Sequence, residues 1–509
     1  MRAVAALVVA ALFASCTTMR APETARFKIL QINDVYKIEG LEGGNSGGLA
    51  RVRTLRKHLQ SDGTPVLVLH GGDLLYPSVM SKFLEARPMV DVLNLLDGDT
   101  TRDDPHLVVT FGNHEFDNRD PKILMERMKE SQFHWVSVNT RWCNPACDQK
   151  FPGQTDVVEF EFNGVQVAIL GLLYPIKKPY VQSFDPIGEA RDAVDALRQN
   201  GVDVVIALTH EDMPDDVALL QAVPGINLVI GGHDHLYMQQ RVGYSWITKA
   251  DADAKSVIVY DVTVGPHGVS TTPVRVTLDT TVPKDPDVDA RVQHWLGALS
   301  EKLGGNETIG TTKNLLEGVE PVVRGRESAL GNLLADAVRE QMQTDVAFIN
   351  GGSIRINDNI PPGPITSYDM EGIFYFTNSL VATRLTGQQL LDILRNAVSR
   401  ADSGDGRFLQ VSGLSFTYQP RAGGFDVTGA RIGGTPLDPN ATYTAATLDY
   451  LYQNGQDDGF TLFVDATRPP KVNTEREADF RTVVEKYIRT RGVVDTEVEG
   501  RIVRQAPDR

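Results

Sequence analysis

The stretch LVVTFGNHEFD, residues 107–117, decides the fold class, because an apolar run of strand length leads directly into a cluster of polar side chains. Three more runs follow the same pattern: TPVLVLHGGD (64–73), DVVIALTHE (203–211) and INLVIGGHDH (226–235). Uninterrupted apolar runs are typical of strands in a sheet that is covered on both faces. Helical patterns lie between the runs, so we predict an α/β fold, α+β over the whole chain. In such folds ligands bind beyond the carboxyl ends of the strands, where these polar clusters fall.

The polar residues at the strand ends are of types that bind metal ions. In chain order they are Asp34, Asp73, Asn113, His114, His210, His233 and His235. Alone, a histidine after a strand is more often structural than ligating. Together, these side chains can enclose two divalent ions, for which Zn, Mn and Co are suitable and Fe is an alternative. One carboxylate has to bridge the ions, and Asp73 suits that role; ions about 4 Å apart hold a phosphoryl group and activate a water molecule.

These blocks resemble those of a known family. ND (33–34), GGD (71–73), GNHEFD (112–117), TH (209–210) and GGHDH (231–235) are similar to the blocks of the calcineurin-like metallophosphoesterases, specifically those of the exported, two-domain 5'-nucleotidase family. The resemblance covers almost the whole chain after its N-terminal segment. It implies a four-layer α/β/β/α sandwich as the N-terminal domain, followed by a second α/β domain that binds the nucleotide.

The resemblance also implies roles for the residues of the metal site. It places one ion on Asp34, Asp73 and His235, and the other on Asp73, Asn113, His210 and His233. His114 and Asp117 are then a catalytic pair beside the metals. A histidine oriented by a carboxylate can stabilise the charge that develops on the phosphoryl or leaving oxygen.

Tyr36 departs from the family pattern, which has a histidine ligand of the first metal at this position. A phenolate is a hard, anionic ligand that favours a trivalent metal over Zn or Mn. Purple acid phosphatases, on a related scaffold, bind iron through the tyrosine of a GDxxY block, and this chain reads GDLLY with Tyr76 at that place. Three interpretations stay open. Tyr36 points away and water replaces it, which we favour; Tyr36 or Tyr76 binds iron; or the first site is weak and activity is reduced or lost.

The C-terminal half carries blocks that bind substrate in the family. In FINGGSIR (348–355) the resemblance implies substrate contacts for Asn350, Gly352 and Arg355, and in PVVRGRESALGN (321–332) for Arg324. The planar fork of donors in a guanidinium group fits a phosphate. A solvated surface charge is the alternative for Arg324.

Two stacked aromatic rings bind the base in the family. Phe376, in FYFTNSLVATRLTG (374–387), matches one of them. In DYLYQNGQDDG (449–459), Tyr452 is the candidate for the other ring and Asp458 the candidate ribose ligand. Stacking contributes about 1–3 kcal/mol per base and tolerates any base. Aromatic residues in β-rich segments are usually core residues, so a structural role stays open for both rings.

Charge and the N-terminal segment restrict location and partners. The formal net charge of -16 argues against a nucleic-acid polymer as partner, since that would require a basic face. MRAVAALVVAALFASC (1–16) is typical of a bacterial lipoprotein export signal, because its apolar run is too short to span a bilayer and small residues precede Cys16. We expect a lipid anchor at Cys16 and a periplasmic or cell-surface location; a plain secretory signal is the alternative. In an exported protein, Cys143 and Cys147 are expected to form a small disulfide rather than a zinc site.

The expected organisation is a signal and tether (1–25), a metallophosphoesterase domain (26–284), a linker helix (285–305) and a substrate-binding domain (306–505), in a monomer. The resemblance implies hydrolysis of nucleoside 5'-monophosphates, with rotation of the second domain about residues 285–310. UDP-sugars, 2',3'-cyclic nucleotides and phosphomonoesters in general are alternative substrates. A nucleotide-binding surface lipoprotein with little turnover is an alternative of another class.

Overall fold

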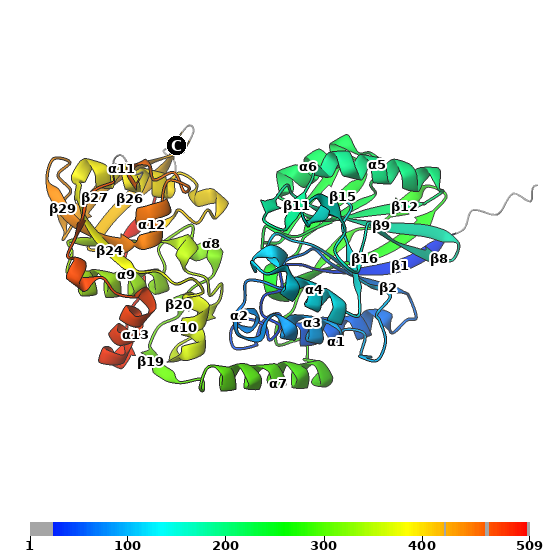
Figure 1. The fold of residues 1–509 in the computed structure, drawn as a ribbon, viewed down its shortest axis with the longest axis horizontal. Coiled ribbons are helices and arrows are strands. Elements are labelled where there is room, and N and C mark those ends of the chain that lie inside the picture. Colours follow the sequence, from blue (N-terminus) through cyan, green and yellow to red (C-terminus); the bar gives the residue numbers. More distant parts are fainter. Residues whose placement is uncertain (1–23, 422–423, 464–467, 506–509) are drawn as a thin grey trace, which may run out of the picture.

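The computed structural model describes residues 24–421, 424–463 and 468–505, so the predicted export signal and Cys16 lie outside the described residues. Two halves of the chain lie side by side, and helix α7 (Pro286–Lys302) runs below both of them in Figure 1. No helix within the described ranges is both long enough and apolar enough to cross a membrane.

Two facing sheets form the centre of the N-terminal half. The first has the strand order β17-β16-β1-β2-β3-β4-β7, with β18 paired to β16, and the second has the order β14-β15-β13-β12-β9-β8. The first sheet consists of β1 (Ala25–Ile32), β2 (Val66–His70), β3 (Leu107–Thr110), β4 (His134–Val136), β7 (Gln154–Thr155), β16 (Ser256–Gly265), β17 (Gly268–Ser270) and β18 (Pro273–Thr277). The second consists of β8 (Val157–Phe162), β9 (Val165–Leu173), β12 (Val204–His210), β13 (Leu228–Gly231), β14 (Met238–Val242) and β15 (Ser245–Lys249).

Each apolar strand packs on two sides, which explains why the runs do not alternate with polar residues. In β2, Leu67 and Leu69 lie between the sheets, whereas Val66 and Val68 face the helices on the outside. Outside the first sheet are α1 (Leu49–Gln60), α2 (Val79–Leu84), α3 (Arg87–Leu93) and α4 (Pro121–Glu130); outside the second are α5 (Pro186–Gln199) and α6 (Met213–Ala222). The predicted four-layer α/β/β/α sandwich is confirmed.

A small sheet flanks the sandwich and contains the cysteine pair. It has the order β10-β11-β5-β6, formed by β10 (Lys177–Lys178), β11 (Val181–Ser183), β5 (Thr140–Cys143) and β6 (Cys147–Gln149). Cys143 and Cys147 are joined by a disulfide, as the sequence predicted.

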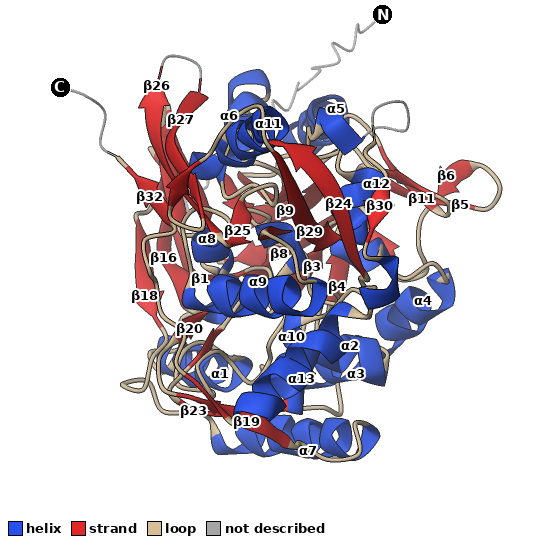
Figure 2. Ribbon diagram, turned by 90° about the vertical axis from the view of Figure 1, so that its left-hand side faces the viewer, coloured by secondary structure: helices blue, strands red, loops and turns tan. Residues whose placement is uncertain are grey.

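The C-terminal half is built around a five-stranded sheet with helices on both faces (Figure 2). Its strands are β25 (Leu409–Ser412), β21 (Val346–Asn350), β29 (Thr442–Leu448), β24 (Leu380–Thr386) and β30 (Lys471–Val472). One face packs on α9 (Ala329–Met342) and α13 (Phe480–Arg491), and the other on α11 (Gly387–Val398) and α12 (Asp449–Asn454). The second α/β unit expected from the sequence is therefore present.

Shorter elements complete this half. A four-stranded sheet is formed by β28 (Thr435–Pro436), β27 (Gly424–Ile432), β26 (Leu414–Arg421) and β32 (Ile502–Arg504), and a three-stranded sheet by β23 (Gly363–Thr366), β19 (Thr308–Thr312) and β31 (Val493–Val494). β20 (Leu316–Glu317) pairs with β22 (Asn359–Ile360). The short helices α8 (Glu320–Val323) and α10 (Ser367–Ile373) lie on the side that faces the N-terminal half (Figure 1).

Candidate metal centre and substrate cleft

The carboxyl ends of the parallel strands deliver the expected metal ligands to one edge of the sandwich. β1, β2 and β3 are parallel neighbours in the first sheet, and β12 and β13 in the second. Asp34, Asp73 and Asn113 follow the first three strands, His210 is the last residue of β12, and His233 follows β13. Parallel pairing therefore brings residues almost 200 positions apart in the sequence to one place.

Four of the candidate ligands adopt a backbone conformation that non-glycine residues rarely adopt. The φ angles of Asp34, Asp73, His233 and His235 are 53°, 57°, 81° and 60°. Such residues cost on the order of 1–3 kcal/mol each and persist only where the surroundings fix them, most often at functional sites. Other described non-glycine residues also have a positive φ, but four predicted metal ligands share this conformation at one site.

The glycines of the motifs allow the strand ends to approach one another. A Cβ atom on Gly112 would lie 2.1 Å from Oδ1 of Asp73, and one on Gly232 would lie 2.3 Å from the carbonyl oxygen of Gly71. Both distances are far shorter than any non-bonded contact, so a larger residue at either position would displace the ligand loops.

Glu115, to which the sequence analysis assigned no role, holds the Asp73 loop. Its buried carboxylate accepts hydrogen bonds from the backbone N–H groups of Asp73 (3.0 Å), Leu74 (2.6 Å), Leu75 (3.0 Å) and Gly112 (2.5 Å). Its place within GNHEFD was the only sequence signal of this function, and motif membership alone did not separate it from the ligands.

Tyr36 lies inside the first cluster of ligands. Oxygen and nitrogen atoms of Asp34, Asp73 and His235 lie within 4.8 Å of one another. The Tyr36 hydroxyl is 2.9 Å from Oδ2 of Asp73, 2.9 Å from Nε2 of His235 and 3.3 Å from Oδ1 of Asp34. Ligand atoms on one ion at about 2.1 Å are roughly 3–3.5 Å apart in a tetrahedron. The distances from the Tyr36 hydroxyl to these atoms are therefore close to those expected between two ligands of the same ion.

The favoured interpretation, in which Tyr36 points away from the site, is wrong. The hydroxyl contacts place the ring inside the cluster, the Tyr36 backbone N–H donates to Oδ1 of Asp253 at 2.8 Å, and only 8% of the residue is exposed. Burial raises the pKa of Tyr36 well above 10, and the carboxylates of Asp73 and Asp34 add to the shift, so the phenol is a neutral donor in this structure. Tyr76 lies elsewhere, with its hydroxyl 3.4 Å from Nδ2 of Asn118.

The second cluster forms around His210. Its Nε2 is 3.1 Å from Oδ1 of Asn113, 3.3 Å from Oδ2 of Asp73 and 3.3 Å from Nδ1 of His233. Its Nδ1 is 2.8 Å from the carbonyl oxygen of Gly71, to which it donates, so that Nε2 is left for a metal. Oδ2 of Asp73 belongs to both clusters. The donor types and spacings thus fit two ions that share Asp73.

Opposing effects set the protonation of this cluster. Burial disfavours ionisation of Asp73, but His210 and His114 outweigh it and hold the pKa of Asp73 well below 3.8. Burial lowers the pKa of His210 while Asp73 raises it, to about 9 overall. His233, buried beside His210, has its pKa lowered to about 4. An ionised carboxylate therefore stands between the two clusters, as a divalent cation requires.

His114 and Asp117 form the expected pair. Nδ1 of His114 is 2.6 Å from Oδ2 of Asp117, and Oδ1 of Asp117 accepts from Nζ of Lys178 at 3.0 Å. Burial opposes protonation of His114, but Asp73 and Asp117 raise its pKa above 6.5. The imidazole is partly exposed and lies 3.9 Å from Oδ2 of Asp73 through Nε2. Lys178, which the sequence analysis missed, fixes the orientation of the pair.

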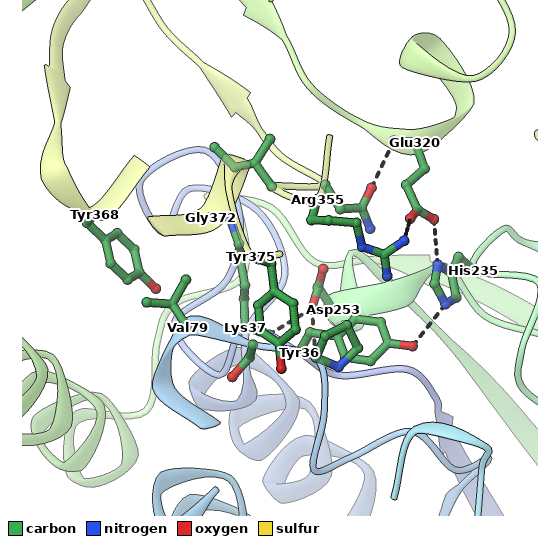
Figure 3. Close-up of a pocket in the computed structure, with 14 residues that line it drawn as sticks. Tyr36, Lys37, Val79, His235, Asp253, Glu320, Arg355, Tyr368, Gly372 and Tyr375 are labelled. Carbon is green, nitrogen blue, oxygen red and sulfur yellow. Dashed lines mark hydrogen bonds and ion pairs between the residues drawn. The ribbon is translucent and has the colours of Figure 1, made fainter. Parts of the chain in front are cut away.

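A pocket between the two halves adjoins the first cluster (Figure 3). Tyr36, His235 and Asp253 line it from the N-terminal half, and Arg355 and Tyr375 from the C-terminal half. Ligand candidates of the first cluster and Arg355, one of the predicted substrate residues, thus face one cleft, although more than 100 residues of sequence separate them.

Arg324 and Arg355 meet at one carboxylate inside this cleft. Glu320 pairs through Oε1 with Nη2 of Arg324 and, at 3.5 Å, with Nη1 of Arg355. Its Oε2 is 3.0 Å from Nδ1 of His235. Arg324 is therefore a largely buried, paired cation and not a solvated surface charge. No motif in the sequence pointed to Glu320.

The other predicted substrate residues differ in accessibility. Phe376 is 52% exposed, and the guanidinium group of Arg355 lies 5.7 Å from its ring centroid. Asn350 is buried and accepts from Oγ of Ser353 at 2.5 Å, while the backbone N–H of Gly352 donates to Gly406 at 2.9 Å. Phe376 thus exposes a ring face beside Arg355. Asn350 is instead buried and stabilises the loop that carries Arg355 through its contact with Ser353.

A stacking role for Tyr452 does not fit the structure. The ring belongs to the hydrophobic core between the five-stranded sheet, α11 and α12, and its hydroxyl donates to the carbonyl oxygen of Pro469 at 2.7 Å. Asp458 is partly exposed near Tyr450, and burial together with Asp405 raises its pKa above 3.8. The core role, which the sequence left open, applies to Tyr452.

Comparison with known proteins accounts for this combination of halves. Residues 27–237 match the family model of calcineurin-like phosphoesterases, and residues 308–465 match that of the 5'-nucleotidase C-terminal domain. The chain belongs to the 5'-nucleotidase family. The 5'-nucleotidase of Homo sapiens is 25% identical over 93% of this chain and 90% of its own length. The trifunctional nucleotide phosphoesterase of Bacillus subtilis (strain 168) is 27% identical over 77% of this chain but only 30% of its own length.

A solved structure of a 5'-nucleotidase shares the arrangement of the whole chain. The crystal structure of the 5'-nucleotidase precursor of Thermus thermophilus matches with a TM-score of 0.74 and 25% identity, covering 95% of this chain and 100% of that chain. As a member of the 5'-nucleotidase family, the protein is a phosphoric ester hydrolase, and its metallophosphoesterase fold implies divalent metal ions.

Proposed function

We propose that the protein removes the 5'-phosphate from nucleoside monophosphates. The observation that carries the proposal is the shared position of Oδ2 of Asp73, 2.9 Å from the Tyr36 hydroxyl in the first cluster and 3.3 Å from Nε2 of His210 in the second. The first cluster adjoins a pocket lined by Arg355 of the other half, and Phe376 lies beside that guanidinium group; the two can bind an anion and an aromatic base.

The metal ligands follow from the two clusters. One ion would be held by Asp34, Asp73, His235 and Tyr36, and the other by Asp73, Asn113, His210 and His233. Two bound divalent ions supply a water molecule of lowered pKa and neutralise the phosphoryl oxygens. The choice among Zn, Mn, Co and Fe depends on Tyr36, because a phenolate favours a harder ion than imidazole does.

The chain's own residues then orient the substrate and move charge. His114, held by Asp117, donates a hydrogen bond toward the phosphoryl or leaving oxygen, since its raised pKa favours the protonated form. Arg355 and Arg324 bind the anion, and Phe376 stacks on the base. Asn350 and Gly352 shape the loop that carries Arg355, and Asp458 is the proposed ribose ligand.

A second candidate activity is a broader phosphoesterase. The Bacillus relative is named a trifunctional nucleotide phosphoesterase, which favours testing UDP-glucose and 2',3'-cyclic AMP beside AMP. A nucleotide-binding protein without turnover is the candidate of another class. The hydrogen-bonded His114–Asp117 pair argues against it, because binding alone does not require these residues.

Phosphate release by metal-stripped protein, resupplied separately with zinc, manganese, cobalt or iron, tests the proposal. We expect release from AMP with at least one metal and a smaller kcat/KM for UDP-glucose and 2',3'-cyclic AMP. Nucleotide binding without turnover under every metal would overturn it in favour of the binding protein. Higher kcat/KM for the cyclic nucleotide or nucleotide sugar would favour the second activity.

We further propose that residues 26–284 and 306–505 form two domains and that the second domain rotates. We also propose that the protein is an exported monomer, anchored through a lipid on Cys16. The disulfide between Cys143 and Cys147 supports export, because such bonds persist outside the reducing cytosol. Substitution of Cys16→Ser tests the anchor: the variant should leave the membrane fraction while its catalytic rate is unchanged.

A further inference from the structure

Glu320 is the one residue of the C-terminal half that binds a candidate metal ligand directly within the described ranges. Its Oε2 lies 3.0 Å from Nδ1 of His235 (Figure 3). It is also held firmly from its own half, because its backbone N–H donates to Oδ1 of Asn357 at 3.0 Å and its carboxylate pairs with Arg324 and Arg355. The contact therefore joins a fixed carboxylate of one half to a histidine of the other.

The two nitrogens of His235 have different tasks. Nε2 faces the first cluster, 2.9 Å from the Tyr36 hydroxyl and 3.5 Å from Oδ1 of Asp34. Nδ1 must then carry the proton, which it donates to Glu320. A carboxylate on the second nitrogen of a ligating histidine fixes its tautomer and orientation and makes it a better ligand, and its loss typically weakens metal binding about 10–100-fold.

His210 provides an internal contrast. Its Nδ1 is fixed by the carbonyl oxygen of Gly71, which belongs to the same half. For Nδ1 of His235, the described part of the chain offers Glu320 as the only hydrogen-bond partner. One metal position is thus supported entirely within the N-terminal half, whereas the other depends on the C-terminal half.

The loop that carries Asp34 and Tyr36 is also held across the boundary. Nζ of Lys37 is 2.9 Å from Oδ2 of Asp358, and the backbone N–H of Glu42 donates to Oδ1 of the same residue at 3.0 Å. The Tyr368 hydroxyl donates to Glu39 at 2.6 Å. Docking of the C-terminal half therefore fixes both the loop of the first cluster and its histidine.

We propose that Glu320 is a positioning residue that couples binding of the first metal to docking of the C-terminal half. If the docked half improves His235 as a ligand, the bound metal favours the docked arrangement by the same factor. The second metal, which would be held by Asp73, Asn113, His210 and His233, is not part of this coupling. The inference rests on the metal centre of the proposed function.

Titration of metal-stripped protein with cobalt(II) alone, without substrate, tests the coupling by calorimetry and by the visible spectrum. Glu320→Ala should weaken one of two cobalt sites about 10–100-fold and leave the other within about twofold. Glu320→Gln keeps the size of the side chain and a hydrogen-bond acceptor, so it should recover part of the affinity. Glu317→Gln is the matched control, because Glu317 pairs with Arg326 at 2.7 Å in the same segment without contacting a ligand.

Two further variants test which metal site Glu320 supports and whether that site depends on docking of the C-terminal half. In an Asp34→Ala background, which removes a ligand of the first metal, Glu320→Ala should leave the remaining cobalt site unchanged. Asp358→Lys replaces the ion pair with Lys37 at the docking contact by two like charges. Position 358 is far from His235 in the sequence. We expect this variant to weaken the first cobalt site severalfold. Cobalt affinities within about twofold of wild type for Glu320→Ala and Glu320→Gln would overturn the proposal. Because substrate is absent, a missing nucleotidase activity would not affect this result.

Discussion

Tyr36 gives the first cluster a donor that differs chemically from imidazole. Its hydroxyl lies within hydrogen-bond distance of Asp34, Asp73 and His235, the three residues proposed to hold the first metal with it. The neutral phenol favoured by burial can bind a cation as a phenolate only if the metal displaces its proton. If Tyr36 binds the first metal as proposed, its phenolate would favour a harder ion than an imidazole at the same position.

Tyr36→Phe should weaken binding of one metal ion about tenfold or more, because the ring remains but a ligand is lost. With iron(III), wild-type protein should show a visible tyrosinate charge-transfer band that the variant lacks. Binding isotherms and absorption spectra measure both effects. Tyr76→Phe is the matched control and should change neither, since the Tyr76 hydroxyl contacts Asn118. An unchanged spectrum in Tyr36→Phe would exclude Tyr36 as a ligand.

His114→Ala should lower kcat by about 10²–10⁴-fold, the usual contribution of a positioned acid or base. Metal content should stay the same, because Nε2 of His114 is 3.9 Å from Asp73 and ligates neither ion in the proposed set. Steady-state kinetics and metal analysis measure the two quantities. His58→Ala, an exposed histidine on α1, is the control. A simultaneous loss of metal would assign His114 to the ligands instead.

At the scale of elements, local sequence explains where helices begin. Asp285 is the N-cap of α7, and its carboxylate accepts from the backbone N–H groups of Asp287 and Val288, both at 3.2 Å. Pro286 at the first helical position lacks the N–H that would be unsatisfied there. Lys57 of α1 also pairs with Asp285, so this cap joins the helix to the sandwich.

Asp285→Ala should lower the free energy of unfolding by about 0.5–2 kcal/mol, the range for loss of an N-cap. Burial opposes ionisation of Asp285, but Lys57 and the helix N–H groups lower its pKa below 3.8. The stabilisation is therefore complete above pH 3.8 and is lost as the pH falls through the lowered pKa. Thermal unfolding of wild type, Asp285→Ala and the surface control Gln293→Ala at pH 7 and pH 3 measures how much stability Asp285 contributes at each pH. A difference that grows on acidification would contradict this account.

At the scale of the whole molecule, the site is divided between two hydrophobic cores. The ligands extend from the sandwich, whereas Arg324, Arg355 and Phe376 extend from the five-stranded half, and the cleft forms only where the halves meet. Stability of the N-terminal half and occupancy of the site are linked, because an ion that binds only the folded state stabilises it.

Removal of metal with a chelator should lower the melting temperature. Each ion at about 100 times its dissociation constant contributes about 2.7 kcal/mol to folding. Hydrogen exchange should increase mainly at residues 33–36, 71–75, 112–117 and 231–235, where four strained φ angles depend on their surroundings. Differential scanning fluorimetry and exchange mass spectrometry measure these effects. Faster exchange confined to the C-terminal half would contradict the location of the metal site.

The sequence alone determined an α/β fold with strands covered on both faces, the ligand types and their strand-end positions, because strand patterning and ligand chemistry are local properties of a few consecutive residues. The four-layer sandwich and the roles proposed for His114, Asp117 and Arg355 came instead from the resemblance of short blocks such as GNHEFD and FINGGSIR to a known family. The sequence could not determine which way Tyr36 points, that Tyr452 lies in a core, or that Glu320 reaches His235. These outcomes depend on contacts between segments far apart in the chain, and only the packing of two sheets and two halves against each other decides them.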